Sequence, residues 1–372
     1  MSLILTELKN RYVETRGFNT DRRLVVIESD DWGSIRMPSR QVFHKLRAEG
    51  DRPEADAFLS NDCLESEKEL ADLFEVLSSV RDSKGAPAVI TANFAMANPD
   101  FESIGGEYSF EPFYKTYDRY YPENKNLSLI KEGIESRVFF PQLHCREHLC
   151  VNRWMADLNS GKADTVTAFN NRMIGIGASF EKGNPFGYMD AFNSAYATEE
   201  ELDRSIKDAC CIFEDTFGFS SKSFVASCFV WNDGLEEILK ANGINGIQCG
   251  YWQLIPKGKG KYRRRLHYTG ERSSQGQIYT VRNCEYEPAY LQNAQECAER
   301  CFGEVQRAFR NNKPAIISSH RFNYIGSIEP RNARSGLMGL KQLLEGIASS
   351  YEDVEFITSA ELLEIISENK NL

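Results

Sequence analysis

The sequence predicts a single α/β domain in which about eight parallel strands form a barrel. Short apolar runs that are typical of buried strands alternate with amphipathic helical segments over almost the whole chain. Eight strands favour a barrel over an open sheet. The chain has 372 residues, 41% of them hydrophobic, which is enough for a large core, and no repeat, low-complexity stretch or clear linker divides it.

Each element follows from its local pattern. Residues 1–21 are expected to form a short polar helix that leads into the barrel domain, residues 22–372. Apolar runs predict strands at 24–27, 88–94, 138–143, 223–230, 246–249, 277–283, 315–319 and 354–358. Helical spacing of apolar residues predicts helices at 38–49, 61–81, 151–158, 199–217, 234–242, 291–311, 336–349 and 360–369. Residues 98–130, rich in aromatic residues and proline, and residues 160–198, rich in glycine and asparagine, are expected to be long loop insertions.

Charge and composition exclude several classes of protein. The net charge of −10 argues against nonspecific binding of nucleic acid, which needs a net basic face. No window approaches 18 apolar residues, so no membrane span is expected. The ten cysteines are scattered without a C-x-x-C pair, and residues 1–11 lack the features of a signal peptide. We therefore expect reduced cysteines in a cytoplasmic protein.

Two adjacent carboxylates follow the first predicted strand. Leu24–Ile27 is apolar, and Asp30 and Asp31 come shortly after it. Alone, such a pair is typical of a turn or a helix cap. In α/β folds, however, the carboxyl ends of the strands are where chemistry gathers, and two neighbouring carboxylates need a positive partner.

Three histidines end two other predicted strands. His144 and His148 are four residues apart directly after one strand, a spacing that lets both imidazoles reach one cation. His320 ends the apolar run Pro314–Ser319. Because the carboxyl ends of parallel strands share one rim, these residues and the aspartates predict a metal hydrolase site with an open coordination position.

In these motifs the sequence resembles the NodB-type polysaccharide deacetylases, carbohydrate esterase family four, as a divergent member. The order and approximate spacing of the motifs match those of the family from about residue 24 to residue 365. The resemblance implies a distorted (β/α)7-8 barrel and the metal-dependent removal of acetyl groups, N-acetyl rather than O-acetyl, from a sugar or glycan precursor. It implies Asp31, His144 and His148 as ligands of a divalent metal, preferably Zn²⁺, with Asp30 as general base and His320 as general acid.

The chain departs from the family pattern in three places. Cys145 stands where the family has serine or threonine, and the family's Arg-Pro-Pro-Tyr motif has no arginine within Phe224–Cys228. Arg282 or Arg321 would have to replace it in space. The later aspartate that tunes the acid histidine also lacks a match near Gln248–Trp252.

Further expectations concern the substrate. Trp32, Asn93, Arg282, Asn283 and Arg321 are candidate substrate contacts, because they follow or end predicted strands. A basic run within residues 257–265 is either a solvated loop or a binding site for an anionic substrate.

Three alternatives stay open. The segment His144–His148 also fits the H-x-x-E-H pattern of inverted zinc peptidases, with Glu147 as base. Another amide or imide hydrolase on the same scaffold, and an inactive carbohydrate-binding relative, are the remaining two.

Overall fold

The computed structural model describes residues 12–13, 15–176, 185–258, 260–291 and 293–369. Its centre is a nine-stranded sheet in which every recorded pairing is parallel. The strands are β1 (Arg23–Trp32), β2 (Ile90–Ala95), β5 (Phe139–Cys145), β6 (Ser223–Val225), β7 (Gly246–Cys249), β10 (Ile278–Val281), β11 (Cys284–Glu285), β12 (Ala315–His320) and β13 (Val354–Phe356). Their order is β10-β7-β6-β5-β2-β1-β12-β11, and β13 pairs with the start of β1.

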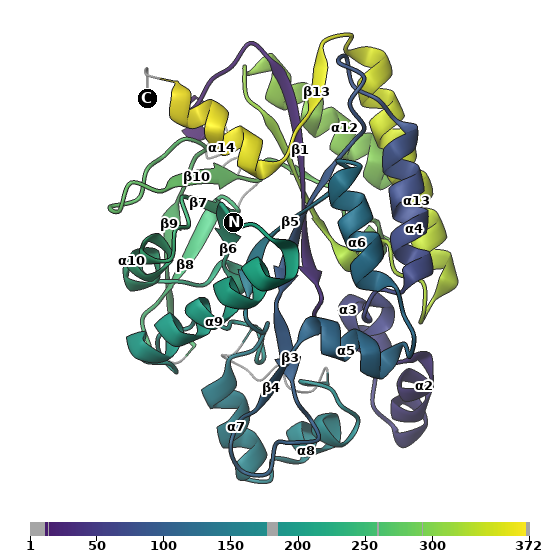
Figure 1. Cartoon of the computed structure of the whole chain (residues 1–372), viewed down its shortest axis with the longest axis vertical. Coiled ribbons are helices and arrows are strands. Elements are labelled where there is room, and N and C mark those ends of the chain that lie inside the picture. The colour runs from purple at the N-terminus through teal and green to yellow at the C-terminus, as the bar shows by residue number, and fades with distance from the viewer. Residues whose placement is uncertain (1–11, 14, 177–184, 259, 292, 370–372) are drawn as a thin grey trace.

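The sheet curls because the strands at its two edges, β10 and β11, are consecutive in the chain. Only Arg282 and Asn283 separate β10, which pairs with β7, from β11, which pairs with β12. One extended segment therefore joins both margins of the sheet. The predicted distorted barrel is confirmed (Figure 1).

Helices surround this sheet. They are α2 (Arg40–Glu49), α3 (Ala57–Asn61), α4 (Glu67–Ser79), α5 (Phe113–Tyr120), α6 (Asn126–Glu135), α7 (Val151–Asn159), α8 (Ala163–Asn170), α9 (Glu199–Phe217), α10 (Asp233–Ala241), α11 (Pro288–Leu291), α12 (Ala294–Arg310), α13 (Pro330–Ser350) and α14 (Ser359–Glu368). Capping residues fix the ends of several helices. Ser66 and Glu69 form a capping box at the start of α4, and Gly218, with φ 79°, ends α9 in the left-handed conformation.

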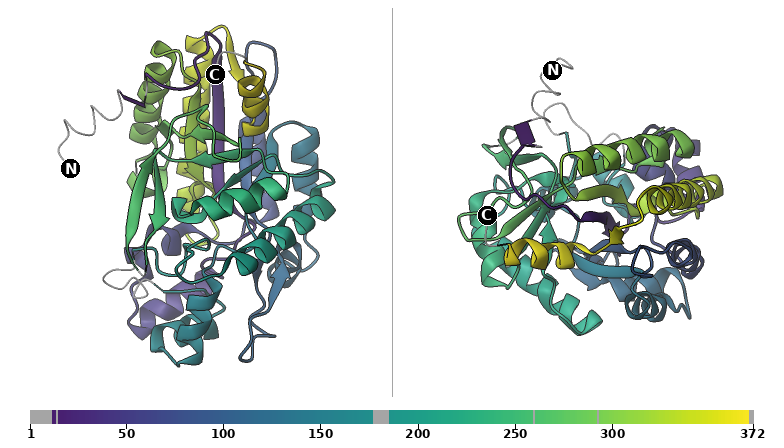
Figure 2. Two further views of the ribbon diagram at one scale, coloured as in Figure 1. Left: turned by 90° about the vertical axis from the view of Figure 1, so that its left-hand side faces the viewer. Right: turned by 90° about the horizontal axis from the view of Figure 1, so that it is seen from above.

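Alternate side chains of β1 pack in two different hydrophobic clusters, one on each face of the strand. Leu24 and Val26 pack in a cluster with residues of α14, which lies across the amino-terminal end of the barrel (Figure 2). Val25 and Ile27 belong to the main core with residues of α4, α6, α12 and α13. Successive side chains point to opposite faces of a strand, so the even-numbered residues of β1 face the barrel interior.

The carboxyl-terminal rim has its own small hydrophobic clusters. Figure 1 places α2, α3, α7 and α8 beyond the lower end of β1. One cluster includes Leu59 and Ile176, and another includes Trp154, Ile174 and Tyr188. These clusters give the rim rigid walls that are separate from the barrel core.

Several local expectations were wrong. Residues 98–130 are not a long loop: they include β4 (Phe110–Pro112), which pairs with β3 (Ala97–Pro99), as well as α5 and the first half of α6. Burial of the aromatic residues Phe113 and Tyr117 in the main core explains the error. The second insertion contains α8, and its residues 177–184 lie outside the described part of the chain, as does most of the expected N-terminal helix.

The strand expected at 223–230 stops at Val225. Ser227–Phe229 forms a 3-10 turn in which Cys228 and Phe229 have φ values of 57° and 54°. The basic run lies on a hairpin of β8 (Trp252–Pro256) and β9 (Tyr262–Leu266).

The ten cysteines all lie in the described part of the chain, and each is unpaired. Among the described helices, none is long and apolar enough to cross a membrane.

Candidate active site

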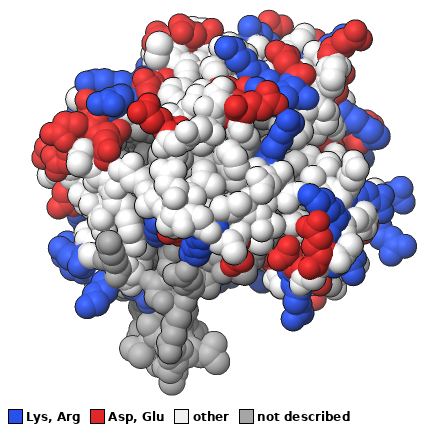
Figure 3. Space-filling view, turned by 90° about the horizontal axis from the view of Figure 1, so that it is seen from below, with Lys and Arg blue, Asp and Glu red and all other residues white. Residues whose placement is uncertain are grey.

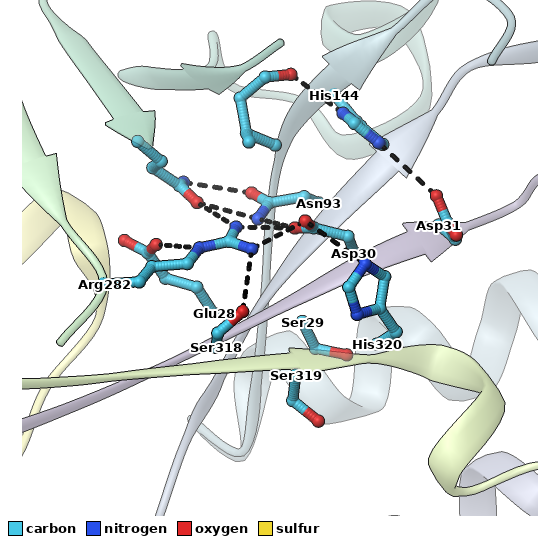
Figure 4. Close-up of polar contacts among 12 residues, drawn as sticks. Glu28, Ser29, Asp30, Asp31, Asn93, His144, Arg282, Ser318, Ser319 and His320 are labelled. Carbon is cyan, nitrogen blue, oxygen red and sulfur yellow. Dashed lines mark hydrogen bonds and ion pairs between the residues drawn. The ribbon is translucent and has the colours of Figure 1, made fainter. Parts of the chain in front are cut away.

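A distortion at the end of β1 brings both adjacent carboxylates to the rim. In a regular strand, Asp30 and Asp31 would point to opposite faces. The pairing of β1 with β2 changes register between Ser29 and Trp32, and Asp31 has a φ of 74°. Such a positive φ is uncommon in a residue other than glycine and marks local backbone strain. As a result Asp30 faces the barrel interior while Asp31 turns toward β5 (Figure 4).

Asp31, His144 and His148 form a compact buried triad. One oxygen of Asp31, Oδ1, lies 3.4 Å from Nε2 of His144 and 3.4 Å from Nε2 of His148. Their potential ligand atoms all lie within 4.8 Å of one another. Asp31 Oδ1 has no hydrogen-bond partner although it is buried. Such an orphaned acceptor between two imidazoles is expected where a cation binds.

The protonation of the triad fits a divalent cation. His144 Nδ1 lies 2.8 Å from the carbonyl oxygen of Val225, so it donates its proton there and leaves Nε2 with a free lone pair. Burial lowers the pKa of His148 to about 3, which keeps this ring neutral at pH 7. Burial opposes ionisation of Asp31, but the Arg36 guanidinium outweighs it and holds the pKa of this carboxyl well below its usual range. Two imidazoles and one carboxylate, with further positions open, are suited to Zn²⁺.

Arg36 forms a salt bridge with the other oxygen of Asp31, Oδ2. Its Nη2 donates to Asp31 Oδ2 over 3.1 Å, and its Nε lies 3.7 Å from Asp62 Oδ2. Arg36 therefore fixes the orientation of Asp31 while Oδ1 stays available to a cation.

Arg282 binds Asp30 from the barrel interior. Its Nη1 and Nη2 donate to Asp30 Oδ2 and Oδ1, each over 2.7 Å, and its Nε donates to Glu28 Oε2 over 2.7 Å (Figure 4). Burial opposes the charge on Asp30, but the guanidinium holds the pKa of this carboxyl well below its usual range. Burial raises the pKa of Glu28 despite the same partner.

Side-chain amides complete the surroundings of Asp30. Asn93 Nδ2 donates to Asp30 Oδ1 over 2.7 Å and to Gln248 Oε1 over 2.7 Å. Ser359 Oγ donates to Glu28 Oε1 over 2.8 Å from the opposite end of the barrel. Asp30 is thereby fixed in one orientation by a satisfied buried network.

His320 faces Asp30 and has its own carboxylate partner. Its Nε2 lies 4.0 Å from Asp30 Oδ2, and its Nδ1 lies 2.6 Å from Glu287 Oε1. Asn323 Nδ2 donates to the other oxygen of Glu287 over 2.6 Å. Burial disfavours the charged ring, but Glu287 outweighs it and raises the pKa of His320 to about 9. His320 therefore carries a proton at neutral pH.

These contacts answer two questions that the sequence left open. Arg282 is the arginine that holds Asp30, and it comes from the junction of β10 and β11 instead of the region of β6. Glu287, just after β11, holds His320. Neither Glu287 nor Arg36 belonged to the predicted site, and no motif in the sequence marks them. The inward position of Glu28 could have been predicted from its spacing of two residues before Asp30.

The expected substrate contacts do not reach the cavity at the rim. Trp32 is buried in the main core and donates to Ser29 Oγ, while Asn93 and Arg282 are occupied by Asp30. Asn283 binds the backbone of Pro314 and Ile316. None of these residues lines the cavity.

Arg321, the fifth expected contact, is also away from the cavity. It is fully buried between Asp62 and Glu65, with its Nε and Nη1 2.9 and 2.7 Å from their oxygens. Its role in this structure is to connect the segment after β12 to the segment after α3.

The arrangement does not fit an inverted zinc peptidase. His144 lies on β5, and the residues up to His148 form no helix. Both oxygens of Glu147 accept hydrogen bonds from Arg146, over 2.6 and 2.8 Å. Glu147 is therefore a salt-bridge partner and not a base at the triad.

The candidate site opens into a cavity of about 300 Å³. Its lining includes the triad, Asp30, Arg36 and His320, together with apolar side chains from α3, from the segment after α8 and from the turn after β6. Figure 3 views this end of the molecule: uncharged atoms fill much of the middle of the face, and the charged side chains gather mainly toward its margin.

Comparisons with known proteins support the fold. No family model matches the sequence, and no curated protein matches it. The "probable Polysaccharide deacetylase" of Pseudomonas aeruginosa PAO1 is similar over 95% of this chain and 93% of its own, with a TM-score of 0.51 and 8% identity. The expected resemblance to polysaccharide deacetylases is confirmed at the level of the fold.

Two further solved structures show weaker similarity. The 4-alpha-glucanotransferase of Thermococcus litoralis matches over 92% of this chain and 40% of its own, with a TM-score of 0.48 and 11% identity. The Xyl-CE4 domain of a multidomain xylanase from the hindgut metagenome of Trinervitermes trinervoides matches over 94% of both chains, with a TM-score of 0.41 and 10% identity.

Proposed function

We propose that the protein is a metal-dependent hydrolase that removes acetyl groups, N-acetyl rather than O-acetyl, from a sugar or glycan precursor. One observation carries the proposal: the Asp30–Arg282 pair and the His320–Glu287 pair face each other beside the triad, with 4.0 Å between His320 Nε2 and Asp30 Oδ2. A metal-binding triad flanked by one ionised carboxylate and one protonated imidazole has the groups that amide hydrolysis requires.

Asp31, His144 and His148 would hold the metal. When bound there, a cation such as Zn²⁺ supplies a Lewis acid for the acyl carbonyl and lowers the pKa of a bound water to about 7. Arg36 keeps Asp31 oriented, and the carbonyl of Val225 keeps His144 in the tautomer that ligation needs.

Asp30 is proposed as the base. Its carboxylate stays ionised because Arg282 binds both of its oxygens, so it accepts the proton of the attacking water. The new bond joins the water oxygen to the acyl carbon. Arg282 and Asn93 hold the carboxylate still, which preserves the alignment that this step needs.

His320 is proposed as the acid. Nitrogen is a poor leaving group in an amide until it is protonated, and His320 Nε2 carries a proton because Glu287 binds the opposite side of the ring. As the carbon–nitrogen bond breaks, this proton passes to the nitrogen. The products are a free carboxylic acid and an amine.

The substitution Asp30→Asn tests the proposed chemistry. It is expected to lower the rate of acetate release from acetylated amino sugars by about 10²–10⁴ while the bound metal stays stoichiometric. Rate and metal content are measured on the same preparation. If Asp30→Asn releases acetate as fast as the parent protein, the base assignment is wrong.

The alternatives predict other outcomes. An inactive carbohydrate-binding relative was suggested by the missing arginine, and Arg282 supplies that contact. Another amide or imide hydrolase would leave acetylated sugars intact and cleave simple amides or cyclic imides, with the same dependence on Asp30. We also propose a cytoplasmic location, for which the ten unpaired cysteines are the supporting observation.

A further inference from the structure

The cavity beside the triad is larger than an acetyl group requires. Its volume is about 300 Å³. An apolar protein cavity of ~150 Å³ is sufficient to bind benzene. An acetyl group is smaller than benzene, so space remains for additional substrate atoms.

One wall of this cavity is apolar. Ile35, Leu59, Ile174 and Ile176 line it and are 1%, 8%, 5% and 4% exposed. Leu59 and Ile176 belong to one hydrophobic cluster of the rim, and Ile174 belongs to the other. The wall is therefore built from packed side chains and does not depend on a single mobile residue.

The polar side chains in the wall are already occupied. Asp56 accepts hydrogen bonds from the backbone of Phe58 and Leu59 at the start of α3. The hydroxyl of Tyr188 is 2.7 Å from Thr165 Oγ1 and 2.6 Å from Asp157 Oδ2. Sugar rings need many hydrogen-bond partners when they are buried. The described wall offers few of them outside the triad, Asp30 and His320.

The proposed acid lies at the outer side of the cavity. The side chain of His320 is 25% exposed, whereas those of His144 and His148 are 3% and 7% exposed. Phe58 contacts His320 edge to face, with ring centres 5.4 Å apart, and the 52% exposed Tyr290 lies beyond Phe58. In the proposed reaction the leaving amine receives the proton of His320, so it would lie at this outer side, over the aromatic rings, and the acyl group would lie on the inner side.

We propose that the site accepts a medium-length N-acyl group, of roughly six to ten carbons, in this apolar cavity. The sugar that carries the amine stays at the mouth. This inference rests on the proposed function for the reaction and extends it from acetyl groups to longer acyl chains.

A series of N-acylglucosamines tests the inference in the metal-loaded protein. With acetyl, butanoyl, hexanoyl and octanoyl substrates, kcat/KM for amine release is expected to rise with chain length, by up to about fourfold for each buried methylene group. A maximum at acetyl followed by a steady decrease would overturn the proposal.

Filling the apolar wall provides a second test. Ile176→Phe is expected to lower the ratio of octanoyl to acetyl kcat/KM by at least tenfold while acetyl activity persists. Ile325→Phe is the matched control, because Ile325 belongs to the same cluster but does not line the cavity, and the ratio should not change. If Ile176→Phe does not fold, Ile174→Phe replaces it at the neighbouring position of the wall. An unchanged ratio in a folded variant of the wall contradicts the proposal.

Binding separates this inference from the proposed reaction. Octanohydroxamate is expected to bind the metal-loaded protein at least tenfold more tightly than acetohydroxamate, as measured by calorimetry. Equal affinities would overturn the acyl cavity. If octanohydroxamate binds more tightly but none of the amides is hydrolysed, the proposed function fails while the acyl cavity stands.

Discussion

Replacing Arg282 with methionine should destabilise the protein more than any surface substitution. Arg282 is the cation shared by Glu28 and Asp30, and the side chains of all three are at most 6% exposed. Arg282→Met removes three hydrogen bonds of 2.7 Å and leaves two carboxylates buried without their cation. Breaking a buried ion pair from one side costs about 3–5 kcal/mol, a large part of a typical unfolding free energy of about 5–15 kcal/mol.

The loss of unfolding free energy in Arg282→Met should be larger at higher pH. In the parent protein, the pKa of Asp30 lies well below its usual range, so its contribution to stability is present above pH ~3.9 and is lost only as the pH falls through the depressed value. Without Arg282, burial dominates and raises the pKa of both carboxyls, so the folded variant takes up protons that the unfolded chain does not. The destabilisation is therefore larger at pH 7 than at pH 5.

Urea unfolding at both pH values measures this effect. Arg300→Met is the control, because Arg300 forms an exposed pair with Glu285 and should cost at most about 1 kcal/mol. Adding Glu28→Gln to Arg282→Met should recover part of the loss, since one buried charge is removed. A loss for Arg282→Met no larger than that of the control, or the same loss at pH 5 and pH 7, would refute the reasoning.

Three further outcomes follow from the site. His144→Ala should abolish stoichiometric metal binding, measured by elemental analysis, whereas His44→Ala, at an exposed position, should retain it. Glu287→Gln should move the alkaline limb of the kcat/KM profile from about pH 9 toward pH ~6.5, because His320 loses the partner that raises its pKa; an unmoved limb would exclude His320 as the acid. Arg321→Met should lower stability by about 3–5 kcal/mol in urea without a specific change in KM, and a KM effect in a fully folded variant would restore it as a substrate contact.

The sequence was sufficient for the residues that end strands. Asp30, Asp31, His144 and His320 each follow an apolar run, and parallel strands deliver their carboxyl ends to one rim, so their proximity follows from topology alone. His148 was added by its spacing from His144. These inferences depend on short-range patterns and on a general property of the fold.

The partners of these residues could not be predicted in the same way. Arg282 approaches Asp30 because β10 and β11 bridge the margins of the sheet, which is a long-range property of the register. Glu287 has no strand-end pattern, and Arg36 acts through a bend after β1. Arg321 illustrates the opposite error: a charged residue beside His320 suggested a substrate contact, but two acidic residues from distant parts of the chain bury it.

The pairing of β1 has a consequence for the order in which the molecule assembles. Val25–Asp30 is hydrogen-bonded along Ala315–His320, so the central strand of the sheet waits for one of the last strands in the chain. Contacts so distant in sequence form slowly because a long loop must close first. The proposed metal ligands Asp31, His144 and His148 all precede residue 149, whereas Arg282, Glu287 and His320 come from the final third. A growing chain thus has the triad's residues long before Arg282, Glu287 and His320, so the proposed hydrolytic site is complete only once the final third of the chain has folded against β1.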